Sequence, residues 1–362
     1  MSKNLNPIKR AVGYALICVV WAILLILLSF FAMVTAIYAD LKAPNERFLT
    51  KGTALETVTR RLYLDYFRPI WQHQANCISF DEDLIYVPRV GVARFQGPEF
   101  DTNITIDPTG LRRQSPPADK QGLIAVAGDS HALGWGVNDE QTFSAVLARK
   151  YHLNTANAAA ASYGTARELL RLRKLGLLAR ASTVVIQYCE NDADENHDFV
   201  HDKAFIPKRD VRALWDSLQH FEQIEVTYPV VTKSSYQFIR DALNAGGMSA
   251  LFKKLFFPTE GLTGQVIEAT RKASVMADDF LNTLDAFPEL KGKTVIVFEI
   301  SGWGQKTDFI PEIQKLAAAR ANFIALEVPF VRSDFFRLDD HMNSTGHERV
   351  AAILFETIKR QH

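Results

Sequence analysis

The sequence predicts an α/β protein in three layers, with a parallel sheet between two layers of helices and one transmembrane helix in front of it. Two observations lead to this prediction. From residue 121 onward, short apolar runs typical of buried strands alternate with segments of helical periodicity, which favours a parallel sheet with helices on both faces. Near the N-terminus, a long stretch without charged residues is typical of a membrane span.

The first element is the uncharged stretch 11–39, whose 29 residues exceed the roughly 20 that a helix needs to cross a bilayer. Residues 1–10 contain basic residues and no acidic ones, so we expect a cytoplasmic tail, a single-pass anchor in the cytoplasmic (inner) membrane and an extracytoplasmic C-terminal part. A cleaved signal peptide is the alternative. Its apolar region is usually about 7–15 residues long, and Ile37 and Ala39 fit a cleavage site poorly.

The next region, residues 40–120, contains turn-forming residues and a few strand-like pieces. We expect an irregular leader that packs on the domain following it. The sequence PPADK at 116–120 predicts the boundary, because consecutive prolines interrupt both helices and strands.

Residues 121–362 carry the alternating pattern of the predicted sheet domain. Strands are expected at 123–128, 182–188, 293–300 and 322–328, and helices at 141–150, 165–180, 313–321 and from about 346. The stretch of about 203–291 interrupts the alternation with helical periodicity and a Gly-Gly break. We interpret it as a helical insertion beside the active face.

Composition excludes some partners. The 41 basic residues balance the 41 acidic ones, which argues against a nucleic-acid binder that neutralises phosphates. Among the three cysteines, Cys77 and Cys189 are the only plausible disulfide pair, because Cys18 lies in the apolar segment, and two reduced thiols are the alternative. The sequence does not indicate an oligomeric state.

A serine stands just after the first predicted strand of the sheet domain, in Gly128-Asp129-Ser130. Open α/β sheets bind ligands at this end of their strands. A serine becomes a useful nucleophile only when a base takes its proton and hydrogen-bond donors stabilise the oxyanion. Ser130 therefore predicts partners elsewhere in the chain.

Candidate partners follow other predicted strands. Asn191 and Asp192 come after 182–188, and an asparagine amide there can donate to an oxyanion. His341 can serve as a general base, oriented by a neighbouring carboxylate. A small-residue turn around 157–165 offers backbone N–H groups as further donors.

Together these segments resemble the SGNH family of GDSL-type serine esterases, as a membrane-anchored bacterial member. The resemblance covers roughly residues 120–202 and 290–362 and implies a flavodoxin-like strand order and no cofactor. It implies Ser130 as nucleophile, His341 as base and Asp339 as the orienting carboxylate, with Asp340 as an alternative. The oxyanion donors it implies are the backbone N–H of Ser130, the N–H of Ser162 or Gly164, and the side chain of Asn191.

The chain departs from the family pattern in three places. Ser162 stands five positions after Asn157, where the family usually has glycine, with Gly164 two residues later. Cys189 also replaces a usual glycine. The family commonly has aspartate three residues before the histidine, where this chain has Leu338, although the D-x-H spacing of Asp339 also occurs.

Further side chains are candidates for other roles. His131, Trp135 and Asp192 are possible substrate-lining residues. His197 and His201 have the i, i+4 spacing that can chelate zinc on a helix. No clear third ligand follows them, so we interpret this stretch as a solvated acidic loop and expect no metal.

These observations predict a membrane-anchored serine esterase acting on ester bonds, with acylated cell-envelope carbohydrate as a reasonable substrate class. The same residues could instead transfer the acyl group to a sugar hydroxyl, which would make the protein an O-acyltransferase of cell-wall or exported polysaccharide. A non-catalytic module that binds glycan or a membrane partner is a third hypothesis.

Overall fold

The computed structural model describes residues 7–42, 48–74, 76–114, 122–202, 211–220, 223–256, 272–304 and 307–361. The chain forms two compact units. Unit 1 comprises Met1–Phe67 and Ile224–Thr259, and unit 2 comprises Arg68–Gln223 and Glu260–His362. The sheet and all the candidate site residues belong to unit 2.

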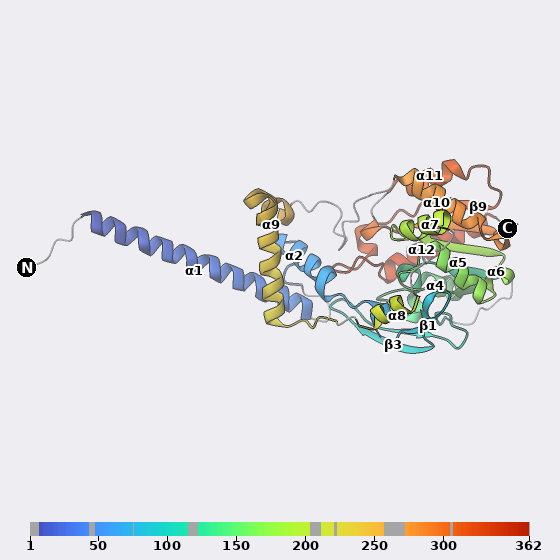
Figure 1. Cartoon of the computed structure of the whole chain (residues 1–362), viewed down its shortest axis with the longest axis horizontal. Helices are drawn as coiled ribbons and strands as arrows, with labels where there is room; N and C mark the ends of the chain where they lie inside the picture. The colour runs from blue at the N-terminus through green and yellow to red at the C-terminus, as the bar shows by residue number, and fades with distance from the viewer. Residues whose placement is uncertain are drawn as a thin grey trace, which may run out of the picture. The chain divides into compact units, whose positions relative to one another are not determined.

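Unit 2 is built around a parallel sheet flanked by helices (Figure 1). The sheet has five strands in the order β6-β5-β7-β8-β9. The strands are β5 (Ile124–Ala127), β6 (Thr155–Asn157), β7 (Thr183–Tyr188), β8 (Thr294–Glu299) and β9 (Phe323–Leu326). This is the predicted flavodoxin-like order. Strand β6 was not predicted, because three residues are too few to produce a strand pattern.

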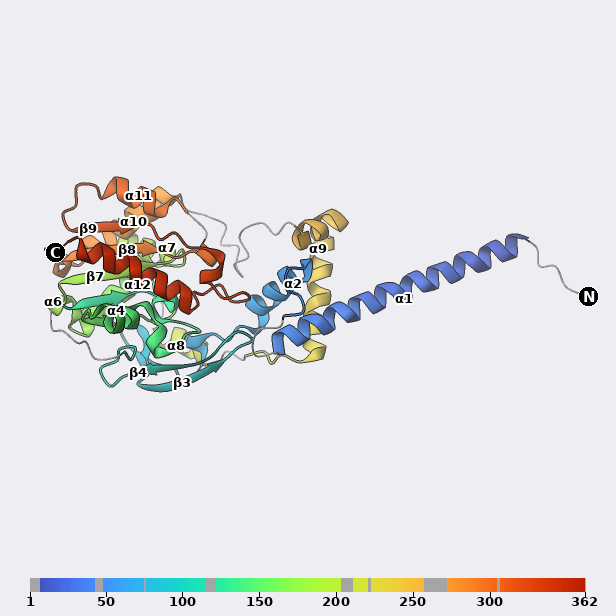
Figure 2. The same cartoon turned by 180° about the vertical axis from the view of Figure 1, so that it is seen from behind.

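Alternate residues of the strands pack into two cores, one on each face of the sheet. One core contains α4 (Phe143–Tyr151) and α12 (Ser344–Lys359), which lie side by side (Figure 2). The other contains α5 (Thr165–Lys174), α6 (Leu177–Arg180), α10 (Ala273–Asp285) and α11 (Phe309–Leu316). The predicted three-layer α/β architecture is confirmed.

Two antiparallel hairpins precede the sheet within unit 2. They are β1 (Ile78–Asp81) with β2 (Ile85–Pro88), and β3 (Gly91–Gln96) with β4 (Asp101–Ile106). Their apolar side chains join the same core as α4 and α12. The expected leader 40–120 is therefore divided between the two units, and the expected boundary at 116–120 lies outside the described residues.

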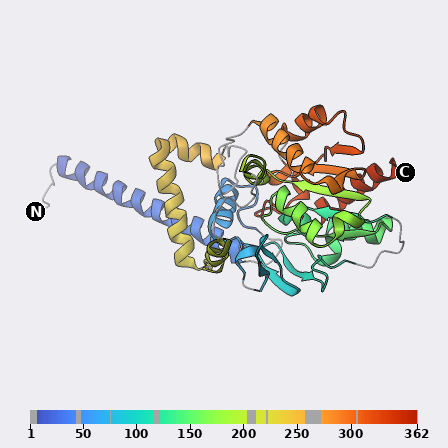
Figure 3. The same ribbon diagram turned by 45° about the vertical axis from the view of Figure 1, so that its right-hand side comes forward.

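Unit 1 contains α1 (Pro7–Lys42), α2 (Ala54–Leu62), the single-turn η1 (Tyr63–Phe67) and α9 (Tyr228–Phe256). Helix α1 is long and apolar enough to cross a membrane. It extends past the predicted end at 39, and Val34, Ile37 and Leu41 near its C-terminus are buried. Figure 3 shows α9 crossing this end of α1, where Tyr38 and Tyr228 are in edge contact.

The predicted insertion at 203–291 needs correction. Its described parts are α8 (Val211–Gln219) in unit 2, α9 in unit 1 and α10, which packs on the sheet. Helix α10 precedes β8 in the chain. Its apolar stripe packs into the core on one face of the sheet and consists of Ala277, Phe280, Leu281 and Leu284. The interpretation of the stretch around His197 and His201 as a solvated acidic loop is also wrong, because Asp192–Asp202 forms helix α7.

Candidate active site

Ser130 lies just beyond β5, at the first residue of the short helix α3 (Ser130–Leu133). Asp129 caps this helix by accepting a hydrogen bond from the His131 amide at 2.9 Å. Gly128 precedes the cap with φ of +150°, and a Cβ there would approach Gln187 Oε1 to 2.8 Å. Only glycine suits this close turn, which directs the chain away from the sheet at Ser130.

The structure brings Ser130, His341 and Asp339 together although they are far apart in the sequence. Ser130 Oγ lies 2.7 Å from His341 Nε2, and His341 Nδ1 lies 2.5 Å from Asp339 Oδ1. The His341 amide also donates to Asp339 Oδ1 at 3.1 Å. A hydroxyl, an imidazole and a carboxylate in this sequence of contacts can transfer a proton away from the hydroxyl.

The charges around His341 favour its protonated form. Burial lowers the pKa of His341, but Asp339 and Asp340 raise it more strongly, to about 9. Burial alone would raise the pKa of Asp339, yet the charge and hydrogen bond of His341 bring it below its ordinary value. The carboxylate of Asp339 therefore stabilises the protonated form of His341.

Asp340 is the second carboxylate at His341. Its Oδ1 lies 3.3 Å from His341 Nδ1, a longer contact than that of Asp339, and 2.7 Å from Arg68 Nη1. Burial would raise the pKa of Asp340, but Arg68 and His341 hold it far below its usual range. The distances thus favour Asp339 as the partner of Nδ1 and give Asp340 a salt bridge of its own.

The loop that carries Asp339 is held by Glu99 and Trp303, which the sequence did not indicate, and by Trp135, which was expected in another role. The carboxylate of Glu99 accepts hydrogen bonds from the three consecutive backbone amides of 337–339, at 2.5, 2.6 and 3.0 Å. Trp303 Nε1 donates to the Asp339 carbonyl at 3.0 Å, and Trp135 Nε1 donates to Asp339 Oδ2 at 3.2 Å. Glu99 is about 240 residues away, so no local spacing could have indicated it.

Ser162 and Gly164 lie in the loop after β6, next to the turn of Ser130. The Ala160 amide donates to the Gly128 carbonyl at 3.1 Å, which joins the two loops. Ser162 has φ of +59°, in the left-handed region that favours glycine. This backbone conformation explains why glycine suits the position, while Ser162 Oγ accepts a hydrogen bond from Gln72 Nε2 at 2.8 Å.

Asn191 follows β7, the strand that pairs with β5, so it comes from the strand end adjacent to that of Ser130. Its side chain is exposed, and no described hydrogen bond joins it to Ser130. Asp192 was expected to line the substrate site. Its side chain is instead completely buried and accepts a hydrogen bond from Thr165 Oγ1 at 3.0 Å. Asp192 therefore does not line an open site.

His131 and Trp135 were also candidates to line the substrate site, and both are buried. Trp135 packs edge-on against Phe95 and Phe100 behind the Asp339 carboxylate. The His131 ring lies 4.6 Å from that of His341, centroid to centroid. Burial holds the pKa of His131 well below its ordinary value, so its imidazole is neutral. Both residues therefore expose little surface, and their role as substrate-lining residues stays a prediction.

The two cysteines considered as a pair, Cys77 and Cys189, are both free. Burial raises the pKa of the Cys77 thiol to about 12, and burial likewise raises the pKa of Cys189. Neither thiol is therefore a thiolate at neutral pH, which makes both poor nucleophiles.

A cavity of about 280 Å³ lies at the carboxyl ends of β8 and β9. It is lined by Glu299, Ser301 and Thr307, among others, and contains none of Ser130, Asp339 and His341. Burial is the main cause that raises the pKa of Glu299 to about 7, against hydrogen bonds from Thr307 and Ser301 that lower it. The cavity therefore carries a carboxyl group that titrates near neutral pH.

No protein-family model matches the sequence, and neither does any curated protein. Solved structures give matches at low identity. One, described as a lipolytic protein of the G-D-S-L family from Desulfitobacterium hafniense DCB-2, has 11% identity and a TM-score of 0.35, covering 65% of this chain and 99% of its own. A carbohydrate esterase family 2 enzyme with a carbohydrate-binding domain, from Corynascus thermopiles (Myceliophthora fergusii), has 14% identity and a TM-score of 0.39, covering 69% of each chain.

TesA has 14% identity and a TM-score of 0.35, covering 66% of this chain and 99% of its own. At such identities and TM-scores these similarities carry no inference about activity. The fold assignment rests on the strand order and parallel pairing described above.

Proposed function

We propose that this protein is a membrane-anchored serine esterase of the SGNH type. The observation that carries the proposal is the continuous contact from Ser130 Oγ through His341 to Asp339, with distances of 2.7 and 2.5 Å. In the proposed reaction, Ser130 Oγ attacks the ester carbonyl carbon while His341 Nε2 takes its proton. The same nitrogen then protonates the departing alkoxide, and Asp339 stabilises the imidazolium.

The proposed oxyanion donors are the Ser130 amide, the amide of Ser162 or Gly164, and the Asn191 side chain. They belong to three neighbouring strand ends of one sheet edge, which supports their convergence on one carbonyl oxygen. Water then attacks the acyl-serine with His341 as base. The apolar α1 supports an anchor in the cytoplasmic membrane and, with it, acylated cell-envelope carbohydrate as the substrate class.

The test uses the full-length protein in detergent with p-nitrophenyl acetate and a fluorophosphonate probe, alongside Ser130→Ala. We expect turnover and covalent labelling that are both lost in the variant. Labelling without turnover would favour an acyltransferase, whose acyl-enzyme is released when a carbohydrate alcohol is added. A folded protein that neither labels nor turns over would overturn the proposal and leave the binding-module hypothesis.

A further inference from the structure

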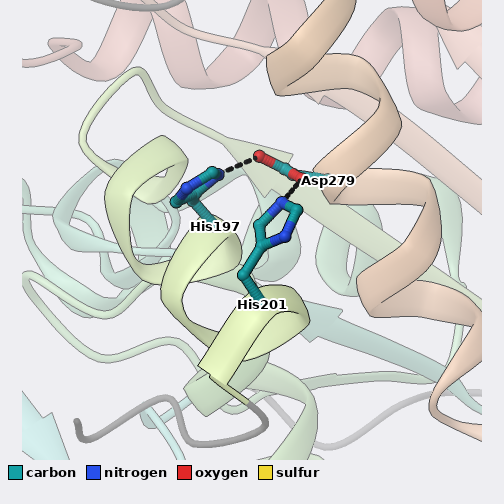
Figure 4. Close-up of side chains that lie close together, drawn as sticks. All are labelled: His197, His201 and Asp279. Atoms are coloured by element: carbon teal, nitrogen blue, oxygen red, sulfur yellow. Dashed lines mark hydrogen bonds and ion pairs between the residues drawn. The ribbon is translucent and has the colours of Figure 1, made fainter.

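Three side chains of unit 2 outside the Ser130 site converge between α7 and α10. His197 and His201 lie one turn apart on α7, and both face Asp279 on α10 (Figure 4). His197 Nδ1 is 2.8 Å from Asp279 Oδ2, and His201 Nε2 is 3.2 Å from Asp279 Oδ1. One ligand atom from each of the three lies within 4.8 Å of the others.

We propose that His197, His201 and Asp279 bind one Zn²⁺ ion. Two imidazole nitrogens and one carboxylate oxygen, with water in the fourth position, form a set that zinc uses in proteins. Mg²⁺ and Ca²⁺ prefer oxygen ligands alone. The sequence showed only the histidine pair, because the carboxylate follows 78 residues after His201 and joins it only in the fold.

The burial of the three groups suits a metal site. The Asp279 side chain is 5% exposed, whereas those of His197 and His201 are 32% and 56% exposed. The described hydrogen-bond partners of the Asp279 side chain are the two imidazoles alone. Buried carboxylates are usually paired with charges or coordinate metals, and the open side of the histidines leaves room for a water ligand.

The surrounding charge also favours a cation. Neither Asp192–Asp202 nor Ala273–Asp285 contains a lysine or an arginine. Both helices carry further acidic residues, including the exposed Asp194, Asp202 and Asp278. The summed negative potential attracts a divalent ion to this face of unit 2.

The position of the site in the chain assigns it a structural role. Helix α7 follows β7, and α10 leads back to β8, while the intervening chain includes Ile224–Thr259 of unit 1. A metal bound by both α7 and α10 links the two points of unit 2 between which the chain runs through unit 1. The ion stabilises unit 2 by binding only when the two helices are packed together.

The test measures zinc bound to the full-length protein in detergent after chelator treatment and dialysis. Competition with a chromophoric chelator, together with metal analysis, should give one equivalent. Zinc at 100 times its Kd should raise the unfolding temperature by about 5–10 °C. His201→Ala and Asp279→Asn should remove both effects, whereas His220→Ala, which changes an exposed histidine at the end of α8, should keep them.

A second cluster, Asp339, Asp340 and His341, could also take the ion, and one variant separates the two sites. His341→Gln should still bind one equivalent of zinc. Loss of binding in His341→Gln with retention in His201→Ala would overturn the proposal, as would the absence of bound zinc in the wild type. Because His201 is more than half exposed, its replacement should leave the protein folded.

Discussion

At the scale of single residues, the proposed mechanism makes the protonation state of His341 decide when Ser130 can react. Two carboxylates raise the pKa of His341 to about 9, and only the neutral imidazole can accept the serine proton. We therefore expect kcat/KM for p-nitrophenyl acetate to rise with pH and to reach half its maximum near pH 9. A half-maximum near pH 6.5, the ordinary value for histidine, would contradict this electrostatic description.

Asp340→Asn tests the source of that shift. The change removes one of the charges that raise the pKa of His341 while leaving the Asp339 contact, so the half-maximum of the pH profile should move to lower pH. Asp339→Asn should instead lower kcat by about 10⁴-fold, because the amide cannot hold the same tautomer or stabilise the imidazolium. If Asp340→Asn lowered kcat more than Asp339→Asn did, Asp340 would be the orienting carboxylate. Measurements of kcat/KM against pH decide between them.

Asn191→Ala tests the proposed oxyanion donor. Removing one such donor typically lowers kcat by about 100-fold to 1000-fold, and the exposed side chain should be dispensable for folding. We expect an unchanged unfolding temperature with severely reduced turnover. Turnover close to that of the wild type would remove Asn191 from the mechanism.

At the scale of elements, the loop that carries Asp339 depends on Glu99. Its carboxylate accepts hydrogen bonds from three partly buried backbone amides, and a buried donor left without a partner costs about 1–3 kcal/mol. Glu99→Ala should therefore lower both kcat and the free energy of unfolding, as measured by esterase kinetics and urea titration. Glu99→Gln is the matched control, because it keeps the shape of the side chain and one acceptor oxygen. Its kcat and free energy of unfolding should lie between those of the wild type and Glu99→Ala. Equal activity in all three proteins would show that this loop needs no such support.

Elements with continuous apolar runs could be predicted from the sequence, because burial on both faces of a parallel sheet leaves little room for polar residues. Strands β5, β7 and β8 belong to this class, whereas β9 carries a similar apolar run although its residues are only half-buried. Ser130 and Asn191 could be singled out because each closely follows a strand, whereas His341 lies in the loop before α12, 15 residues beyond the end of β9. Glu99, Arg68 and Asp279 could not be found this way, since their contacts join distant parts of the chain. Helix α10 was misplaced because an amphipathic stripe does not identify the surface that it covers.

At the scale of the whole molecule, α1 has two parts with different surroundings. Residues 8–29 are almost entirely exposed and match the length of a membrane span, whereas Val34, Ile37 and Leu41 are buried in unit 1. Asp40, which is also buried, accepts hydrogen bonds from the amides of Leu49 and Thr50. The C-terminal part of the helix is thus a structural element of unit 1.

A truncation series tests this division. A protein that begins at residue 30 should leave the detergent phase and keep unit 1 folded. A protein that begins at residue 43 should lose unit 1, because each buried Val, Leu or Ile side chain contributes about 1.5–3 kcal/mol. Limited proteolysis between residues 48 and 67 reports the difference. Equal protection in both proteins would contradict the structural role of the end of α1.

The salt bridge between Arg68 and Asp340 also limits how far the reaction can take place from the bilayer. Residues 43–68, 26 in all, connect the end of α1 to this salt bridge, whose acidic partner touches His341. A chain of that length spans at most about 90 Å even when fully stretched. With α1 held in a membrane, the length of this chain limits the distance between His341 and the bilayer. Residues 30–42 of α1, which follow the exposed span, add about 20 Å. The proposed esterase therefore acts on esters that come within about 110 Å of the bilayer surface, and more distant esters must diffuse to it.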